Sequence, residues 1–225
     1  MRRFKKFIGV LFVVSVLSIS GQADASIFIN EILADPGAGL IGDANKDGAG
    51  SITQDEFVEI LNYGTSSFNI SGWSLFDALS LRHTFPNNSV IPAWHYLVVF
   101  GGGTPNLPGV LWQKATSGGL SLNNSAETVT LFDLSHTAVD KVVYGALAGH
   151  DQSIVRNPEA PSAAFVLHTS LAEAQGARFS PGTSTDGRTQ HSAAVPEAST
   201  LIYLLSALGA MGIYRLKSRM PSNNF

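Results

Sequence analysis

The chain has 225 residues and no cysteine, which excludes disulfides, zinc–thiolate sites and cysteine nucleophiles. The formal net charge of the whole chain is −3. Residues 26–194, which we call the body, contain seven Lys or Arg and fifteen Asp or Glu, a net charge of −8. So acidic a body argues against nucleic acid as a partner, because neutralising phosphates requires a basic face.

The N-terminus has the pattern of a secretory signal peptide. A basic start, MRRFKK, precedes an apolar run over residues 7–19, and Ala23 and Ala25 form an A-x-A cleavage site. We therefore expect residues 1–25 to be removed and the remaining chain to be exported.

The body is predicted to be all-β. Short runs of β-branched and aromatic residues are separated by clusters of Gly, Pro, Asn and Ser, and turns at this spacing favour a sandwich over a barrel. Within one predicted strand, Val58 and Ile60 share a face, and Glu59 lies on the other face between apolar neighbours. We interpret Glu59 as a partly buried, hydrogen-bonded structural acid, with a catalytic acid as the alternative. The predicted strands span residues 26–33, 56–62, 72–78, 81–85, 96–100, 110–113, 128–133 and 140–145.

Between the first two predicted strands, the run DANKDG has the spacing of a calcium loop. Calcium prefers about six to eight oxygen ligands, and a glycine at the sixth position of such a loop permits a sharp turn. Asp43, Asn45 and Asp47 supply three side-chain oxygens, and Gly48 follows them. The pattern indicates a Ca²⁺ site, and a solvated acidic turn is the alternative.

The carboxylate that should close this loop is two residues beyond the expected twelfth position, which is occupied by Gln54. If Ala49 and Gly50 are a two-residue insertion, Ser51 and Thr53 occupy later ligand positions and Glu56 takes the bidentate one. A metal bound there would stabilise a long connection in a domain without disulfides.

Patterns typical of catalysis are not found in the sequence. It contains no G-x-S-x-G, H-x-H or H-E-x-x-H run. We therefore expect a non-enzymatic protein without catalytic residues or an organic cofactor. Its exposed loops at 101–109 and 114–125 are candidate regions for ligand contact.

Several blocks of the body resemble a lamin tail domain. They are INEIL, EFVEILNYGTSSFNISGWSLFD, HTFPNNSVIPAWHYLVVF, LNNSAETVTLFD and AVDKVVYG, and they run from about residue 27 to residue 144. Whether the similarity continues to SPGTSTDG near Ser180 is left open. The resemblance implies an immunoglobulin-like β-sandwich, and bacterial members carry a similar D-x-N-x-D-G insert. We expect a domain over residues 26–160 and a tail or linker over residues 161–194.

The C-terminus contains a short apolar segment that precedes basic residues. Residues 198–214 are uncharged and would form a helix about 25 Å long at ~1.5 Å per residue, the short limit for spanning a bilayer. Arg215, Lys217 and Arg219 follow and should stay cytoplasmic, which leaves the body outside.

Together with Pro196 and Glu197, residues 195–219 resemble the PEP-CTERM sorting signal of Gram-negative bacteria, although Ala198 replaces its usual second proline. The resemblance implies cleavage near Pro196-Glu197 by an exosortase, and transfer from the inner membrane to the cell surface or the medium. A plain C-terminal anchor on a periplasmic protein is the alternative.

The sequence thus predicts an exported binding or structural module whose ligand is a protein or a polysaccharide. Because lamin tail domains also accompany catalytic domains, a secreted protein associated with a hydrolase or nuclease is the competing interpretation.

Overall fold

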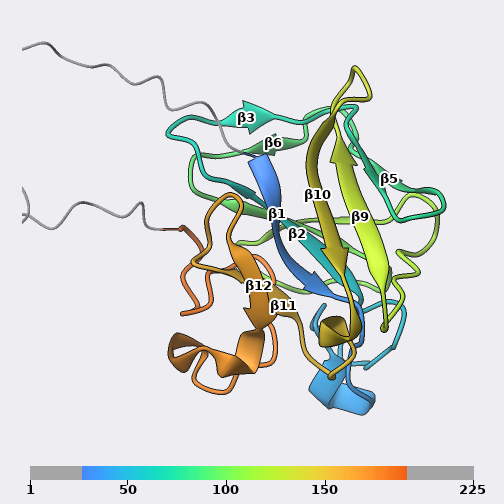
Figure 1. Cartoon of the computed structure of the whole chain (residues 1–225), viewed down its shortest axis with the longest axis vertical. Helices are drawn as coiled ribbons and strands as arrows, with labels where there is room; N and C mark the ends of the chain where they lie inside the picture. Colours follow the sequence, from blue (N-terminus) through green and yellow to red (C-terminus); the bar gives the residue numbers. More distant parts are fainter. Residues whose placement is uncertain (1–26, 192–225) are drawn as a thin grey trace, which may run out of the picture.

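The structure, a computed structural model, describes residues 27–191, and two β-sheets pack face to face in it (Figure 1). The larger sheet has the order β12-β11-β1-β2-β7-β8 and the smaller has the order β10-β9-β4-β5, while β3 and β6 form a separate ribbon. Neighbouring strands are antiparallel except for β7 and β8, which run parallel. Two stacked, mainly antiparallel sheets match the immunoglobulin-like sandwich expected from the sequence.

The strands of the larger sheet are β1 (Ile27–Leu33), β2 (Phe57–Asn62), β7 (Tyr96–Phe100), β8 (Leu111–Lys114), β11 (Ile154–Asn157) and β12 (Ala164–Leu167). The remaining strands are β3 (Phe68–Asn69), β4 (Ser74–Phe76), β5 (Leu81–Thr84), β6 (Val90–Ile91), β9 (Glu127–Phe132) and β10 (Ala138–Tyr144). Helical backbone in residues 27–191 is limited to four 3-10 turns, η1 (Gly39–Gly42), η2 (Ala146–Ala148), η3 (His168–Ser170) and η4 (Ala172–Ala174).

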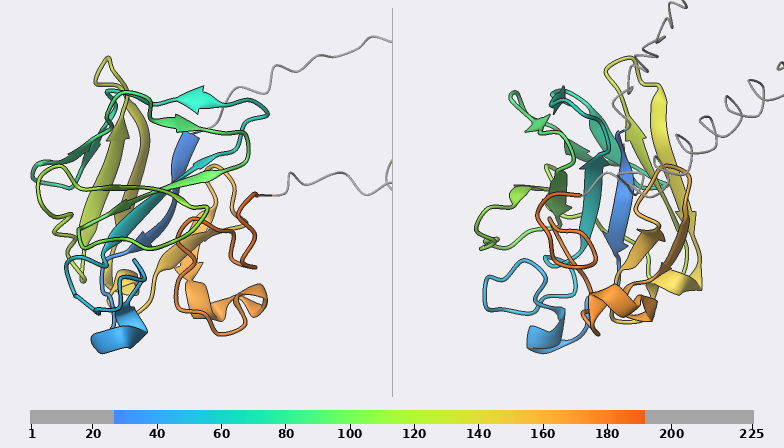
Figure 2. Two further views of the ribbon diagram at one scale, coloured as in Figure 1. Left: turned by 180° about the vertical axis from the view of Figure 1, so that it is seen from behind. Right: turned by 90° about the vertical axis from the view of Figure 1, so that its left-hand side faces the viewer.

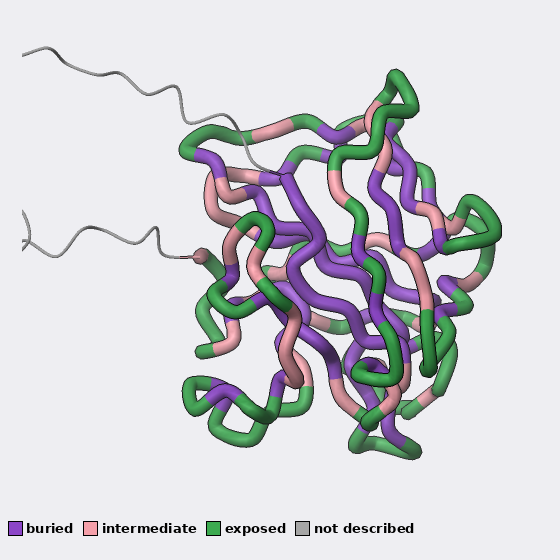
Figure 3. The backbone as a smooth tube through the Cα atoms, in the orientation of Figure 1, coloured by how far each residue is buried: buried purple, intermediate pink, exposed green. Residues whose placement is uncertain are grey.

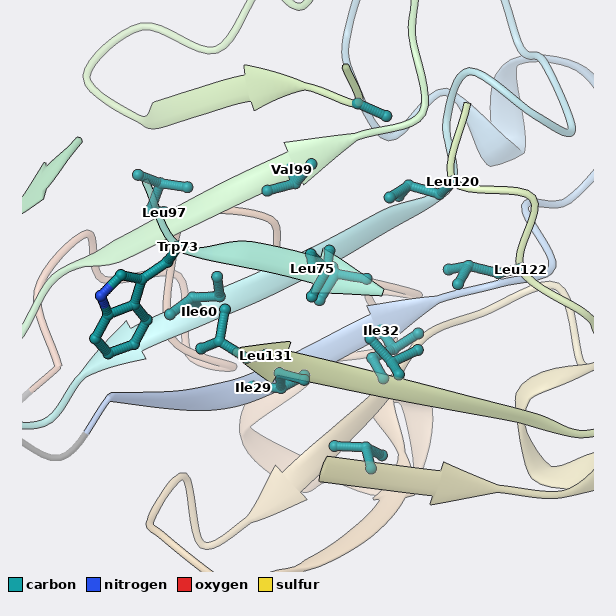
Figure 4. Close-up of a cluster of buried hydrophobic side chains, with 14 of the residues drawn as sticks. Ile29, Ile32, Ile60, Trp73, Leu75, Leu97, Val99, Leu120, Leu122 and Leu131 are labelled. Atoms are coloured by element: carbon teal, nitrogen blue, oxygen red, sulfur yellow. The ribbon is translucent and has the colours of Figure 1, made fainter. Parts of the chain in front are cut away.

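The main core lies between the two sheets. Figure 4 shows Ile29 and Ile60 of the larger sheet facing Leu75 and Leu131 of the smaller one, and all four are buried. Trp73, directly after the turn at Gly72, packs into the same cluster. The alternation predicted for β2 is confirmed, because Val58 and Ile60 belong to this core.

The outer face of the larger sheet is also covered, so β1 and β2 are buried along their whole length (Figure 3). Leu33, Phe57 and Phe100 form a second cluster there, against which Val110 and Phe179 pack. The covering chain comes from the β7–β8 connection and from residues 168–191, which we call the C-terminal segment. Because β1 and β2 are buried on both faces, their sequences are near-continuous apolar runs.

All eight predicted strands are present, with ends within two residues of the expected positions. The sequence did not predict β3, β6, β11 and β12. The first two contain only two residues each, and β11 carries Arg156, whose guanidinium donates to the Ile29 and Ala163 carbonyls inside the structure. Because β11 is short and contains a charged residue, its sequence did not predict a strand.

Residues 161–194 were expected to be a tail or linker. In their described part, β12 pairs with β11 as the edge of the larger sheet, and the C-terminal segment packs on its outer face. The sandwich therefore continues past residue 160.

The predicted signal peptide, the processing residues and the apolar segment 198–214 lie outside the described residues. Within residues 27–191, no helix has the length and hydropathy needed to cross a membrane.

Candidate functional site

The loop predicted to bind metal forms a cradle in which acidic and amide side chains accept hydrogen bonds from their own backbone. The Asp43 carboxylate accepts the Gly48 amide at 3.1 Å. The Asn45 side-chain oxygen accepts the Asp47 amide at 2.9 Å, and Asp47 Oδ1 accepts the Ala49 amide at 3.0 Å. These are the local turns that Asp and Asn favour. The structure thus places the first three predicted ligands in one compact turn.

Asp55 closes this loop. Its fully buried carboxylate accepts the backbone amides of Asn45 at 3.0 Å and of Ser51 at 2.7 Å. Burial raises the pKa of Asp55, and the negative charge of Asp43 adds to that rise. The calcium-loop pattern did not predict a role for Asp55, although its position as an acidic residue next to Glu56 was visible in the sequence.

Glu56, the residue assigned to the bidentate position, is not brought into the cradle. Its buried carboxyl group lies against the backbone amides of Ser121 and Leu122, and burial raises its pKa to about 7. Successive residues of an extended chain point in opposite directions, so Asp55 and Glu56 cannot both face the loop. The alignment with a two-residue insertion selected Glu56, whereas the fold turns Asp55 toward the loop.

The other two predicted ligands also have different roles here. Ser51 Oγ accepts the Gln54 amide at 3.2 Å, and Thr53 is exposed. In the part of the chain that the structure describes, no group of three or more His, Asp or Glu side chains is arranged to hold a metal ion. One feature still favours a cation, since Asp43 Oδ1 is buried and has no hydrogen-bond partner.

We expect Asp55→Ala to lower the free energy of unfolding by about 2 kcal/mol, because the amides of Asn45 and Ser51 lose their acceptor. Urea unfolding of the two proteins measures the difference. The exposed neighbour Gln54→Ala is the control and should stay within about 0.5 kcal/mol of the parent. An equally small change for Asp55→Ala would show that Asp55 does not hold the loop closed.

On the larger sheet, Glu31 attaches the C-terminal segment to β1. Its carboxylate accepts the Ser180 amide at 2.9 Å and the Ser180 hydroxyl at 2.7 Å, and it also accepts the Ser153 hydroxyl. His168 extends the network, because one of its ring nitrogens bonds to Ser180 Oγ at 2.9 Å. Burial raises the pKa of Glu31, while the hydrogen bonds and the nearby His168 oppose the rise.

Glu59 on β2 and Glu159 continue the same attachment. Glu59 accepts the Gly182 amide at 2.6 Å and the Asn30 side chain at 3.0 Å. Glu159 accepts the Thr185 amide at 2.8 Å. Burial raises the pKa of Glu59 well above its usual range, and the charge of Glu31 reinforces the rise. These bonds confirm that Glu59 is hydrogen-bonded, but it is fully buried rather than partly buried as expected.

Within the C-terminal segment, the partners of these glutamates come from the run SPGTSTDG. Gly182 has φ +80°, and a Cβ at this position would lie 2.2 Å from a methyl carbon of Val110. A glycine is therefore needed for the chain to approach the sheet so closely. The turn residues of this run were visible in the sequence, but their buried acceptors were not.

The comparison with known proteins agrees with this architecture. A family model described as Lamin Tail Domain matches residues 20–146, more than half of the chain. A search of curated proteins gives no match. The matched region contains the loop at residues 43–55 and ten of the twelve strands, but not β11, β12 or the C-terminal segment. With the predicted blocks and the sandwich in agreement with the match, the chain belongs to the lamin tail domain family.

Proposed function

We propose that this lamin tail protein is a non-enzymatic module that is exported and sorted to the cell surface or the medium of a Gram-negative bacterium. There it binds a protein or polysaccharide or has a structural role. The observation that carries the proposal is the order of its parts. A sandwich over residues 27–191 stands between a signal-peptide pattern and a PEP-CTERM-like ending. An exosortase-type enzyme would cleave near Pro196-Glu197 once the apolar segment has entered the inner membrane.

The buried ionisable side chains that contact the C-terminal segment support a role without catalysis. Glu31 and Glu59 are fully buried and bonded to the C-terminal segment, which separates them from any substrate. Both ring nitrogens of His168 are engaged, with Ala177 O and Ser180 Oγ. Shifted pKa values occur in structural hydrogen-bond networks as well as in active sites, and the raised pKa values of Glu31 and Glu59 fit a structural network.

The test is fractionation of the native cells with an antibody raised against the sandwich. We expect mature protein on the surface or in the medium, and its mass should show the loss of residues 1–25 and of the chain beyond about Pro196-Glu197. Replacing both Pro196 and Glu197 by alanine should retain a longer form in the inner membrane, whereas Glu173→Ala should be sorted normally. A parent protein that keeps its full C-terminus in the inner membrane would indicate a plain anchor.

The same proposal includes stabilisation by Ca²⁺ at the loop of Asp43, Asn45 and Asp47. The supporting observation is the unpartnered buried Asp43 Oδ1, next to the Asp55 carboxylate, whose pKa the charge of Asp43 helps to raise. Oxygen donors of this kind suit a hard cation. A solvated acidic turn remains the competing description of the loop.

Thermal unfolding of the mature protein with millimolar calcium or with chelator tests the calcium site. Ligand linkage predicts about 2.7 kcal/mol of added stability at a hundred times the dissociation constant. Asp47→Ala should abolish the added stability, while Glu56→Gln should preserve it, because Glu56 faces Ser121 and Leu122. An unchanged unfolding midpoint together with no calorimetric heat of binding would eliminate the calcium site.

A further inference from the structure

A cavity of about 530 Å³ lies between the β7–β8 connection and the C-terminal segment, next to the loop at residues 43–55. Figure 2 shows that loop and the C-terminal segment at the same end of the sandwich. We call this space the basic cavity. Its volume lies within the range of about 300–1,000 Å³ that is usual for small-molecule sites. The residues that matter here are Ile41, Lys46, Leu107, Val110, Arg178 and Phe179.

Hydrogen bonds hold both walls of the basic cavity in place. On one side, the Asn106 amide donates to the Asn45 carbonyl at 2.8 Å, and the Thr104 amide donates to Asp47 at 3.0 Å. On the other side, Ser180 is bonded to Glu31, and the following chain is bonded to Glu59. Walls fixed in advance reduce the entropy lost when a ligand binds.

The charge of the basic cavity is opposite to that of the protein around it. Residues 26–194 carry seven basic side chains, and two of them, Lys46 and Arg178, line this one cavity. No Asp or Glu is among its lining residues. Lys46 Nζ lies 5.4 Å from the centre of the Phe179 ring, and Arg178 donates to the Asp151 carbonyl at 3.0 Å. Lys46 is therefore held against a lining residue, and Arg178 is anchored by the Asp151 carbonyl.

The remaining lining is largely apolar. Leu107, Val110 and Phe179 are only partly buried and belong to the cluster that covers the outer face of the larger sheet. Apolar walls with a few convergent polar groups are typical of small-molecule sites. The cavity thus combines an apolar surface with two positive charges and no negative one.

We propose that the basic cavity binds a small organic anion, with a carboxylate or sulfonate group between Lys46 and Arg178 and an apolar body against Val110 and Phe179. This site would add a small-molecule ligand to the protein or polysaccharide ligand of the proposed function. It depends on the described sandwich alone, so a failure of export or sorting would leave it untouched. Its recognition is by charge and apolar contact, so a neutral compound of the same shape should bind poorly.

The experiment measures how a ligand protects Lys46 from acetylation by an amine-reactive ester, with peptide mass spectrometry as the readout. The full chain is carried in phospholipid nanodiscs. The probe is 2-naphthalenesulfonate, and its neutral counterpart is 2-naphthalenesulfonamide. Lys141, which is exposed on β10, is the internal control within the same molecule.

We expect the sulfonate to slow the acetylation of Lys46 in a saturable manner and to leave Lys141 unchanged, whereas the sulfonamide should protect neither. Arg178→Met should weaken the protection about threefold, the effect of one partly exposed charge contact. Ala177→Trp, which fills the cavity from an exposed lining position, should abolish the protection. Equal protection of both lysines, none at Lys46, or protection that persists in a folded Ala177→Trp variant would overturn the proposal.

Discussion

Replacing Glu31 by alanine is expected to lower the free energy of unfolding by about 3–5 kcal/mol, the cost of removing one partner from a fully buried polar network. The substitution leaves three donors without their acceptor, namely the Ser180 amide and the hydroxyls of Ser180 and Ser153. It also opens a space under the C-terminal segment. Urea unfolding measures the stability, and amide hydrogen exchange should show faster exchange at Ser180 and Gly182.

The control for this experiment is Glu173→Ala, which removes an exposed glutamate from the same segment. It should change the stability by no more than about 0.5 kcal/mol. Glu31→Gln retains one acceptor oxygen and should fall between the control and Glu31→Ala. If Glu31→Ala unfolds at the same urea concentration as the control, the C-terminal segment is not held by Glu31.

Stability is expected to fall as the pH rises above the ordinary pKa of glutamate, and Glu56 should account for a measurable part of the decrease. The folded protein raises the pKa of Glu56 from 4.5 to about 7, so the folded state binds this proton more tightly than the unfolded state. Its contribution is therefore complete below about pH 4.5 and is lost as the pH passes through 7. Over that window it amounts to on the order of 3 kcal/mol.

Glu56→Gln isolates this contribution, because glutamine keeps an oxygen facing Ser121 and Leu122 but carries no charge. We expect parent and variant to have similar stability near pH 4.5, and the variant to be more stable near pH 8. The raised pKa values of Glu31 and Glu59 act in the same direction in both proteins and cancel in the difference. Urea unfolding of the parent and the variant from pH 4.5 to 8.5, with chelator throughout, measures this difference in stability. A difference in stability that stays constant with pH would show that the pKa of Glu56 is not raised.

The buried His83 changes the total pH profile in the opposite direction. Burial lowers the pKa of His83, so its neutral form is favoured in the folded protein and its contribution is lost as the pH falls. The comparison of parent with Glu56→Gln removes this effect, since His83 is common to both.

The loop at residues 43–55 shows which contacts a local sequence pattern can predict and which it cannot. Asp43, Asn45 and Asp47 were identified because their spacing alone generates the turn, in which each side chain bonds to a backbone amide at most five residues away. Asp55 was missed because its role depends on which way the chain faces as it enters β2. One residue of register separates it from Glu56, and one residue reverses the direction of a side chain.

The sequence by itself determined the all-β class, the position of eight strands and the family, because a period of two and turn residues are local properties of the chain. It also identified Glu59 as structural from its apolar neighbours. Only the tertiary structure decided that the C-terminal segment belongs to the sandwich and that the basic cavity lies beside it. The contact of Glu31 with Ser180 joins residues 149 positions apart, and the local sequence around neither residue specifies the other.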